Sequence, residues 1–176
     1  MRHIPSLAAC AFLGACATAE ITTPPVMVVP NDPAGAVGLD VYARDRARGN
    51  PVPRFRGQDM VQIRTFGDTG NGNGEIAGAA CTLDSGLYKA AFNTPANVAV
   101  PDYGPNSPAL FVRCEGTNDR SGSVTVQTIN QTNAGRNASA AGTGLLGAIV
   151  IGAVNASRMN PETDDFGYNA IAVQLK

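Results

Sequence analysis

Side chains that could carry catalysis or bind a transition metal are few in this chain. Its 176 residues include one histidine, His3, and four cysteines, namely Cys10, Cys16, Cys81 and Cys114. The first 15 residues are typical of a segment removed on export, as argued below, so we expect the mature chain to hold no imidazole. That composition excludes Ser-His-Asp and Cys-His nucleophile systems and the usual imidazole metal ligands. We therefore expect no enzyme activity, no cofactor and no metal centre.

Carboxylates offer a second route to acid–base or cation chemistry. Glu162, Asp164 and Asp165 stand close together and together could hold a cation, but we favour a solvent-facing acidic turn. Glycosidases work through two carboxylates alone, yet no pair of acids here is singled out by its context. The glycine- and asparagine-rich run 67–75 lacks the ending of a phosphate loop and has glycine at the third ligand position of a calcium loop. We expect it to be a hairpin connection.

Five arginines lie within the short segment 44–56. One hypothesis is a basic face that binds a glycan, peptidoglycan or a lipid headgroup, because guanidinium groups pair well with phosphates and carboxylates. The other, which we favour, is a solvated loop whose arginines pair with nearby aspartates, with prolines preventing a regular helix. The chain as a whole has a net charge of −1, which gives no reason to expect a nucleic-acid partner. The residues concerned are Arg44, Arg46, Arg48, Arg54 and Arg56, with Asp32, Asp40, Asp45 and Asp59 as their expected partners.

The N-terminus carries one arginine, an apolar run, and then Leu13-Gly14-Ala15-Cys16. This pattern resembles the bacterial lipoprotein signal, in which cleavage precedes the cysteine and the cysteine receives acyl chains such as palmitate. A competing box ends at Cys10, but it would leave an apolar core of only about six residues, shorter than a signal needs. The resemblance implies lipidation at Cys16, and two or three acyl chains anchor a protein stably. The residue after the cysteine is Ala17, and a residue other than aspartate there resembles the pattern of lipoproteins sent to the outer membrane. The sequence leaves open whether the protein faces the periplasm or the cell surface.

Cys81 and Cys114 lie in segments where apolar residues alternate with polar ones. Ala79, Cys81 and Leu83 share one face of a predicted strand, and Leu110, Val112 and Cys114 repeat the pattern. Both cysteines therefore face inward, and in the oxidising cell envelope we predict a disulfide between them. Two separate buried thiols are the alternative.

Short alternating runs separated by turn residues predict a mainly β protein, a small antiparallel β-sandwich-like domain with one helical segment near the C-terminus. We divide the chain into a signal peptide (1–15), a lipidated N-terminus, tether and arginine-rich insert (16–56), and a disulfide-stapled β domain (57–176). Expected strands include 26–29, 38–43, 60–66, 87–92, 97–100, 123–130 and 168–175, with a loop over 101–108.

Segment 140–157 is rich in glycine and alanine and differs from the rest of the chain. Small residues recur there at steps of four, which lets another backbone approach closely. Its strongly apolar part is too short to span a bilayer. A helix packed against the β body, a ridge for self-association or a buried strand would each fit the pattern. The predicted interaction ridge comprises Gly144, Ala148, Gly152 and Ala156.

The chain also resembles a module of poorly characterised Gram-negative envelope lipoproteins. The shared pattern is G-A-x-C-x-L, then T-P-A-x-V-x-V, then L-x-V-x-C, here Gly78–Leu83, Thr94–Val100 and Leu110–Cys114. Those relatives also have a glycine-rich segment before a short terminal strand. The resemblance implies a small surface-anchored β-sandwich that displays short repeats and does not catalyse a reaction. The loop 101–108 and the arginine-rich insert depart from it.

Together these observations favour a non-enzymatic outer-membrane lipoprotein, a structural or interaction module of the cell envelope. Its expected partners are the membrane, through the lipid anchor, and an envelope protein or a second copy of the chain. A binding module that uses the arginine-rich insert is the alternative.

Overall fold

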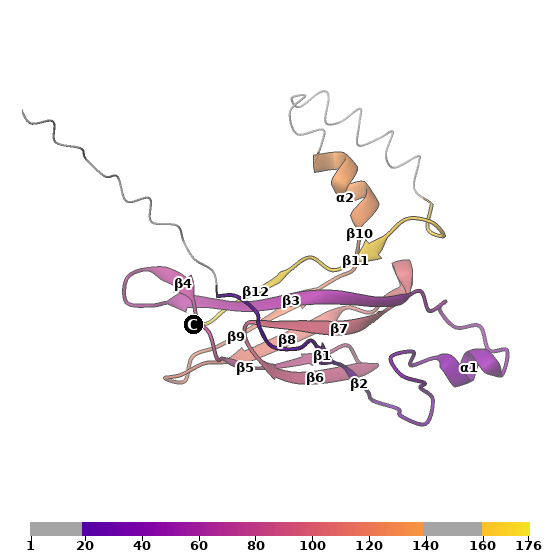
Figure 1. Ribbon diagram of the computed structural model, residues 1–176, viewed down its shortest axis with the longest axis horizontal. Coiled ribbons are helices and arrows are strands. Elements are labelled where there is room, and N and C mark those ends of the chain that lie inside the picture. The colour runs from indigo at the N-terminus through magenta and orange to yellow at the C-terminus, as the bar shows by residue number, and fades with distance from the viewer. Residues whose placement is uncertain (1–18, 139–159) are drawn as a thin grey trace, which may run out of the picture.

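The computed structural model describes residues 19–138 and 160–176, which form a mainly β structure of two packed sheets (Figure 1). The predicted fold class is confirmed, whereas the ridge segment 140–157 and Cys16 lie outside the described residues. The elements are β1 (Val26–Met27), β2 (Val29–Pro30), α1 (Ala43–Ala47), β3 (Gly57–Asp68), β4 (Asn73–Glu75), β5 (Ala80–Asp84), β6 (Tyr88–Asn93), β7 (Ala96–Asp102), a 3₁₀ turn η1 (Gly104–Asn106), β8 (Leu110–Glu115), β9 (Ser121–Val126), β10 (Ile129–Asn130), α2 (Gln131–Ala138), β11 (Phe166–Gly167) and β12 (Ile171–Gln174).

The strand order defines the two layers. The first sheet runs β1-β7-β3-β12, with β4 folding back on β3, and the second runs β2-β6-β5-β8-β9. Most neighbours are antiparallel, but β1 pairs with β7 and β12 with β3 in parallel. The strands β10 and β11 form a separate ladder that carries α2.

The core lies between the two sheets and follows from the alternation in the sequence. Val61 and Ile63 of the first sheet and Leu83 and Val112 of the second are at most 1% exposed. The alternating pattern thus places one face of each strand in the core and leaves the other outside.

Cys81 and Cys114 stand directly opposite each other on β5 and β8 and form a disulfide, with 4.1 Å between their Cα atoms. The predicted bridge is confirmed, and it joins neighbouring strands of one sheet rather than the two layers. Both cysteines are at most 3% exposed. The chain-entropy model gives a stabilisation of about 3 to 4 kcal/mol for a loop of this length.

At one edge of the sandwich the chain crosses between the sheets. Val26 and Met27 pair with β7, and two residues later Val29 and Pro30 pair with β6. Val28, at the crossing, is 4% exposed. The predicted strand at 26–29 is therefore confirmed as two short strands, and residues expected to precede the domain are part of its sheets.

At the opposite edge of the sandwich, the chain after β12 joins the first sheet to β9 of the second. Ser121 at the start of β9 and Lys176 after β12 exchange two backbone hydrogen bonds of 3.1 Å. Gly122 permits this approach, because a Cβ there would lie 2.1 Å from the Gln174 carbonyl oxygen. Short segments thus join the two sheets at both sides of the sandwich, which limits pairing of these edges with other chains.

Three local predictions are wrong. Residues 38–43 are not a strand, because Gly38 has a φ of +60° and only an isolated bridge joins Val37 to Asp40. The arginine-rich segment does contain a helix, α1, which ends before Gly49 at a φ of +82° and before the prolines. The segment 101–108 is only partly loop, since β7 continues to Asp102.

We predict that Gly122→Ala lowers the free energy of unfolding by about 1–3 kcal/mol, the usual cost of overpacking. The added methyl group would collide with the β12 backbone, which cannot rotate away as a side chain can. Urea denaturation measures the effect, with the exposed Ser123→Ala on the same strand as the control. Equal stability of the two variants would contradict the close β9–β12 contact.

Candidate functional site

The arginine-rich insert packs on the β body through a partly buried polar network. The Arg46 guanidinium pairs with Asp40 and donates to the Pro53 carbonyl at 2.6 Å. The Tyr103 hydroxyl accepts from the Val41 N–H at 2.8 Å and donates to Asp40 Oδ1 at 3.2 Å. Burial raises the pKa of Tyr103 above its usual value and keeps the hydroxyl protonated. Arg46 therefore holds the insert in place.

Arg56 fastens the same end of the sandwich to the segment before β11. Its guanidinium donates to the carbonyls of Pro161 and Asp164 and lies 6.0 Å from the centre of the Phe166 ring. It also rests on Gly104, where a Cβ would lie 2.4 Å from Arg56 Cζ. Two of the five predicted anion-binding arginines thus have structural contacts.

The other three arginines, Arg44, Arg48 and Arg54, are exposed. Arg48 pairs with Asp45 at 3.5 Å. The pairs of Arg46 with Asp40 and Arg48 with Asp45 are among those the sequence predicts. Asp32, by contrast, accepts from the Ala34 N–H.

The acidic segment 162–165 is not a simple solvent-facing turn. Asp164 is 6% exposed and accepts from Asn130 Nδ2 at 2.7 Å and from the Asn160 N–H at 3.1 Å. The pairing of β10 with β11 buries it, a contact that the local sequence could not indicate. Glu162 and Asp165 are exposed as predicted, and within residues 19–138 and 160–176 no group of three acids, histidines or cysteines could hold a metal ion.

Asp59, near the Gly57 end of β3, is a carboxyl group whose pKa is raised. Its Oδ2 atom is buried without a hydrogen-bond partner among the described residues and packs against the backbone of Gly167. Burial, then the nearby carboxylates of Asp102 and Asp165, raise its pKa to about 6. A cavity of about 260 Å³ lies beside it, lined also by Gln131 and Tyr168. Such a carboxyl can gain or lose a proton close to neutral pH.

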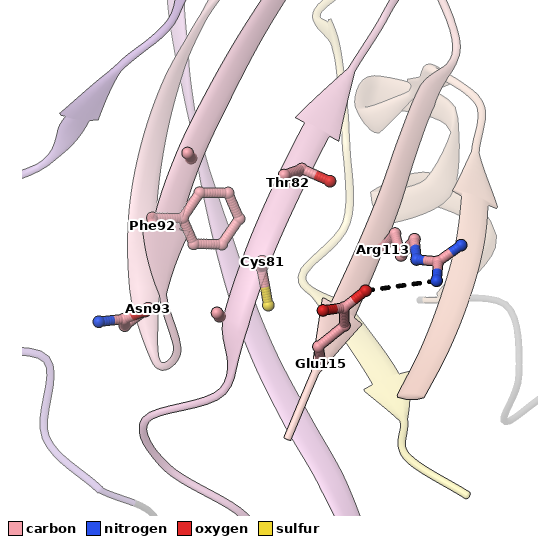
Figure 2. A pocket seen from close by; sticks show the side chains of 8 residues that line it. Cys81, Thr82, Phe92, Asn93, Arg113 and Glu115 are labelled. Atoms are coloured by element: carbon pink, nitrogen blue, oxygen red, sulfur yellow. Dashed lines mark hydrogen bonds and ion pairs between the residues drawn. The ribbon is translucent and has the colours of Figure 1, made fainter. Parts of the chain in front are cut away.

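A shallow groove lies on the outer face of the second sheet (Figure 2). Its volume is about 480 Å³, and the small side chains of Ala80, Thr82 and Ala91 leave space along β5 and β6. Arg113 and Glu115 on β8 form one wall and are paired at 3.3 Å, both well exposed. The groove can offer van der Waals contact and hydrogen bonds. Sequence reasoning misses this groove because alanine and threonine occur at many outward positions.

The same face continues into an apolar depression of about 540 Å³. Val29 and Phe111 contribute apolar surface and are 56% and 44% exposed. Lys89 and Asp84, directly opposite each other on β6 and β5, also line it.

Comparison with known proteins gives no relative: no family model matches the chain, and no curated protein or solved structure is significantly similar to it. Within the described residues, no helix is both long enough and apolar enough to cross a bilayer.

We predict that Asp59→Asn removes part of the pH dependence of stability between pH 4 and pH 6. The pKa of Asp59 rises on folding from its usual value of about 3.9 to about 6. The native state therefore binds more protons than the unfolded state in this window, and the native protein loses stability as the pH rises through it. Asparagine abolishes that loss, so the variant should be relatively more stable at pH 7.

Urea denaturation at several pH values measures this slope. Asp119→Asn is a matched control, because Asp119 is exposed on a turn whose φ of 56° asparagine also tolerates. An unchanged slope in Asp59→Asn would show that this carboxyl titrates normally.

Proposed function

We propose that this protein is a non-enzymatic lipoprotein of the outer membrane, attached through Cys16, that serves as a structural or interaction module of the cell envelope. The observation that carries the proposal is the distribution of its cysteines. Cys16 ends a sequence that resembles a lipoprotein signal, while Cys81 and Cys114 form a buried disulfide. Disulfides of this kind persist in oxidising compartments such as the periplasm and cell surface.

The interaction surface we propose is the ridge of Gly144, Ala148, Gly152 and Ala156. On one side of segment 139–159 lies the helix α2, and on the other the turn 160–165 leads into β11. There the Gln131 N–H donates to the Asp165 carbonyl at 2.8 Å, and the Asp165 N–H donates to Thr132 Oγ1 at 3.0 Å. These contacts support a module that presents the segment from one fixed place on the sandwich.

A second candidate is a binding module for a glycan, peptidoglycan or a lipid headgroup. The observation in its favour is that Arg44, Arg48 and Arg54 are exposed. Retention on peptidoglycan or lipopolysaccharide that falls steeply with salt would favour this candidate, because exposed charges are screened by ions.

We predict that Gly144→Leu and Gly152→Leu abolish crosslinking of the protein to its partner or to itself in intact cells, because leucine prevents close backbone approach. Gly142→Leu is the matched control, since Gly142 lies outside the four-residue repeat and residues two apart do not share a helix face. Covalent crosslinking before lysis, followed by immunoblotting, measures the effect. An unchanged pattern in all three variants would count against the ridge.

A further inference from the structure

Ala19, the first described residue, is fixed to the sandwich. Its N–H donates to Glu75 Oε2 at 2.9 Å, and its carbonyl accepts from Arg64 Nη1 at 2.8 Å. Arg64 and Glu75 also pair with each other at 2.5 Å, and their side chains are only 15% and 11% exposed. We call these three residues the Ala19 clamp. Because Arg64 lies on β3 and Glu75 on β4, the clamp holds the chain against the first sheet.

The clamp leaves little chain between the body and the proposed lipid. Three residue steps separate Cys16 from Ala19, and a fully extended chain spans at most about 3.6 Å per residue, so the reach is no more than about 11 Å. The strand β3 alone has 12 residues, which corresponds to roughly 37 Å. A body on so short a connection cannot present all its surfaces equally to the bilayer.

The clamp lies toward one end of β3. Glu75 pairs with Phe66, and beyond it the β3–β4 turn has only uncharged side chains from Thr69 to Gly74. Gly57, at the other end of β3, pairs with Asp102 and follows the arginine-rich insert. Figure 1 accordingly shows β4 and α1 at opposite ends of the sandwich.

We propose that the edge formed by the Ala19 clamp and the β3–β4 turn is the membrane-facing surface of the protein, and that its occupant is the headgroup layer of the phospholipid bilayer. This inference rests on the proposed function, since it requires acylation at Cys16. The turn residues 69–74 carry no charge, and the exposed Asp68 beside them adds one carboxylate, whereas the three carboxylates of Asp59, Asp102 and Asp165 lie toward the far end. The arginine-rich insert then faces away from the bilayer and is free for a soluble or envelope partner.

Energy transfer from tryptophan to a dansyl-headgroup lipid tests this orientation, because the chain contains no tryptophan of its own. Asn71→Trp places the donor in the β3–β4 turn, and Asn50→Trp places it beyond α1. Both asparagines are exposed, so the two variants are matched. Each is purified in its acylated form from membranes and reconstituted into phosphatidylethanolamine–phosphatidylglycerol vesicles that contain the dansyl lipid.

We expect several-fold greater transfer from Asn71→Trp than from Asn50→Trp. Adding Arg64→Ala and Glu75→Ala to both variants opens the clamp without leaving one charge unpaired, and should bring the two signals closer together. Equal transfer from the two acylated single variants, or greater transfer from Asn50→Trp, would overturn the proposed orientation. An intact mass without acyl chains would instead overturn the lipoprotein proposal, and the orientation with it.

Discussion

The structure depends on the closure of two small sheets around one apolar core. An open sheet leaves its edge strands with unpaired backbone groups, and here short, non-local contacts join the two sheets at both sides of the sandwich. On one side Val28 carries the chain from β7 to β6, and on the other Ser121 and Lys176 exchange backbone hydrogen bonds. The described segments 26–30 and 171–176 are therefore part of the fold. The disulfide adds a covalent constraint at the middle of the second sheet.

The packing of the two sheets also determines where the polar contacts and the outer groove lie. The long strand β3 has the Ala19 clamp toward one end and the Arg56 and Asp59 contacts at the other. Arg46 and Arg56, which in sequence look like parts of a basic patch, fix the insert and the segment before β11. The outer face of the second sheet keeps a groove of small residues open to solvent.

The sequence predicted the features that depend on local alternation. A period of two predicts that Cys81 and Cys114 face inward, and their strands and the disulfide between them are confirmed. Features that depend on distant contacts were missed. The local sequence predicts a turn at Asp164, but Asn130 of β10 binds its buried carboxylate. The raised pKa of Asp59 comes from burial first, and then from carboxylates on β7 and on the segment before β11. The helix α1 is not predicted because the nearby prolines outweigh its two alanines and two arginines, which are good helix formers.

Intact mass spectrometry of the protein purified from the membranes of its native host tests the central proposal most directly. We predict a chain that begins at an acylated Cys16 and whose remaining cysteines, Cys81 and Cys114, become alkylated only after reduction. An unacylated chain with two thiols that react before reduction would contradict both the membrane anchor and the disulfide.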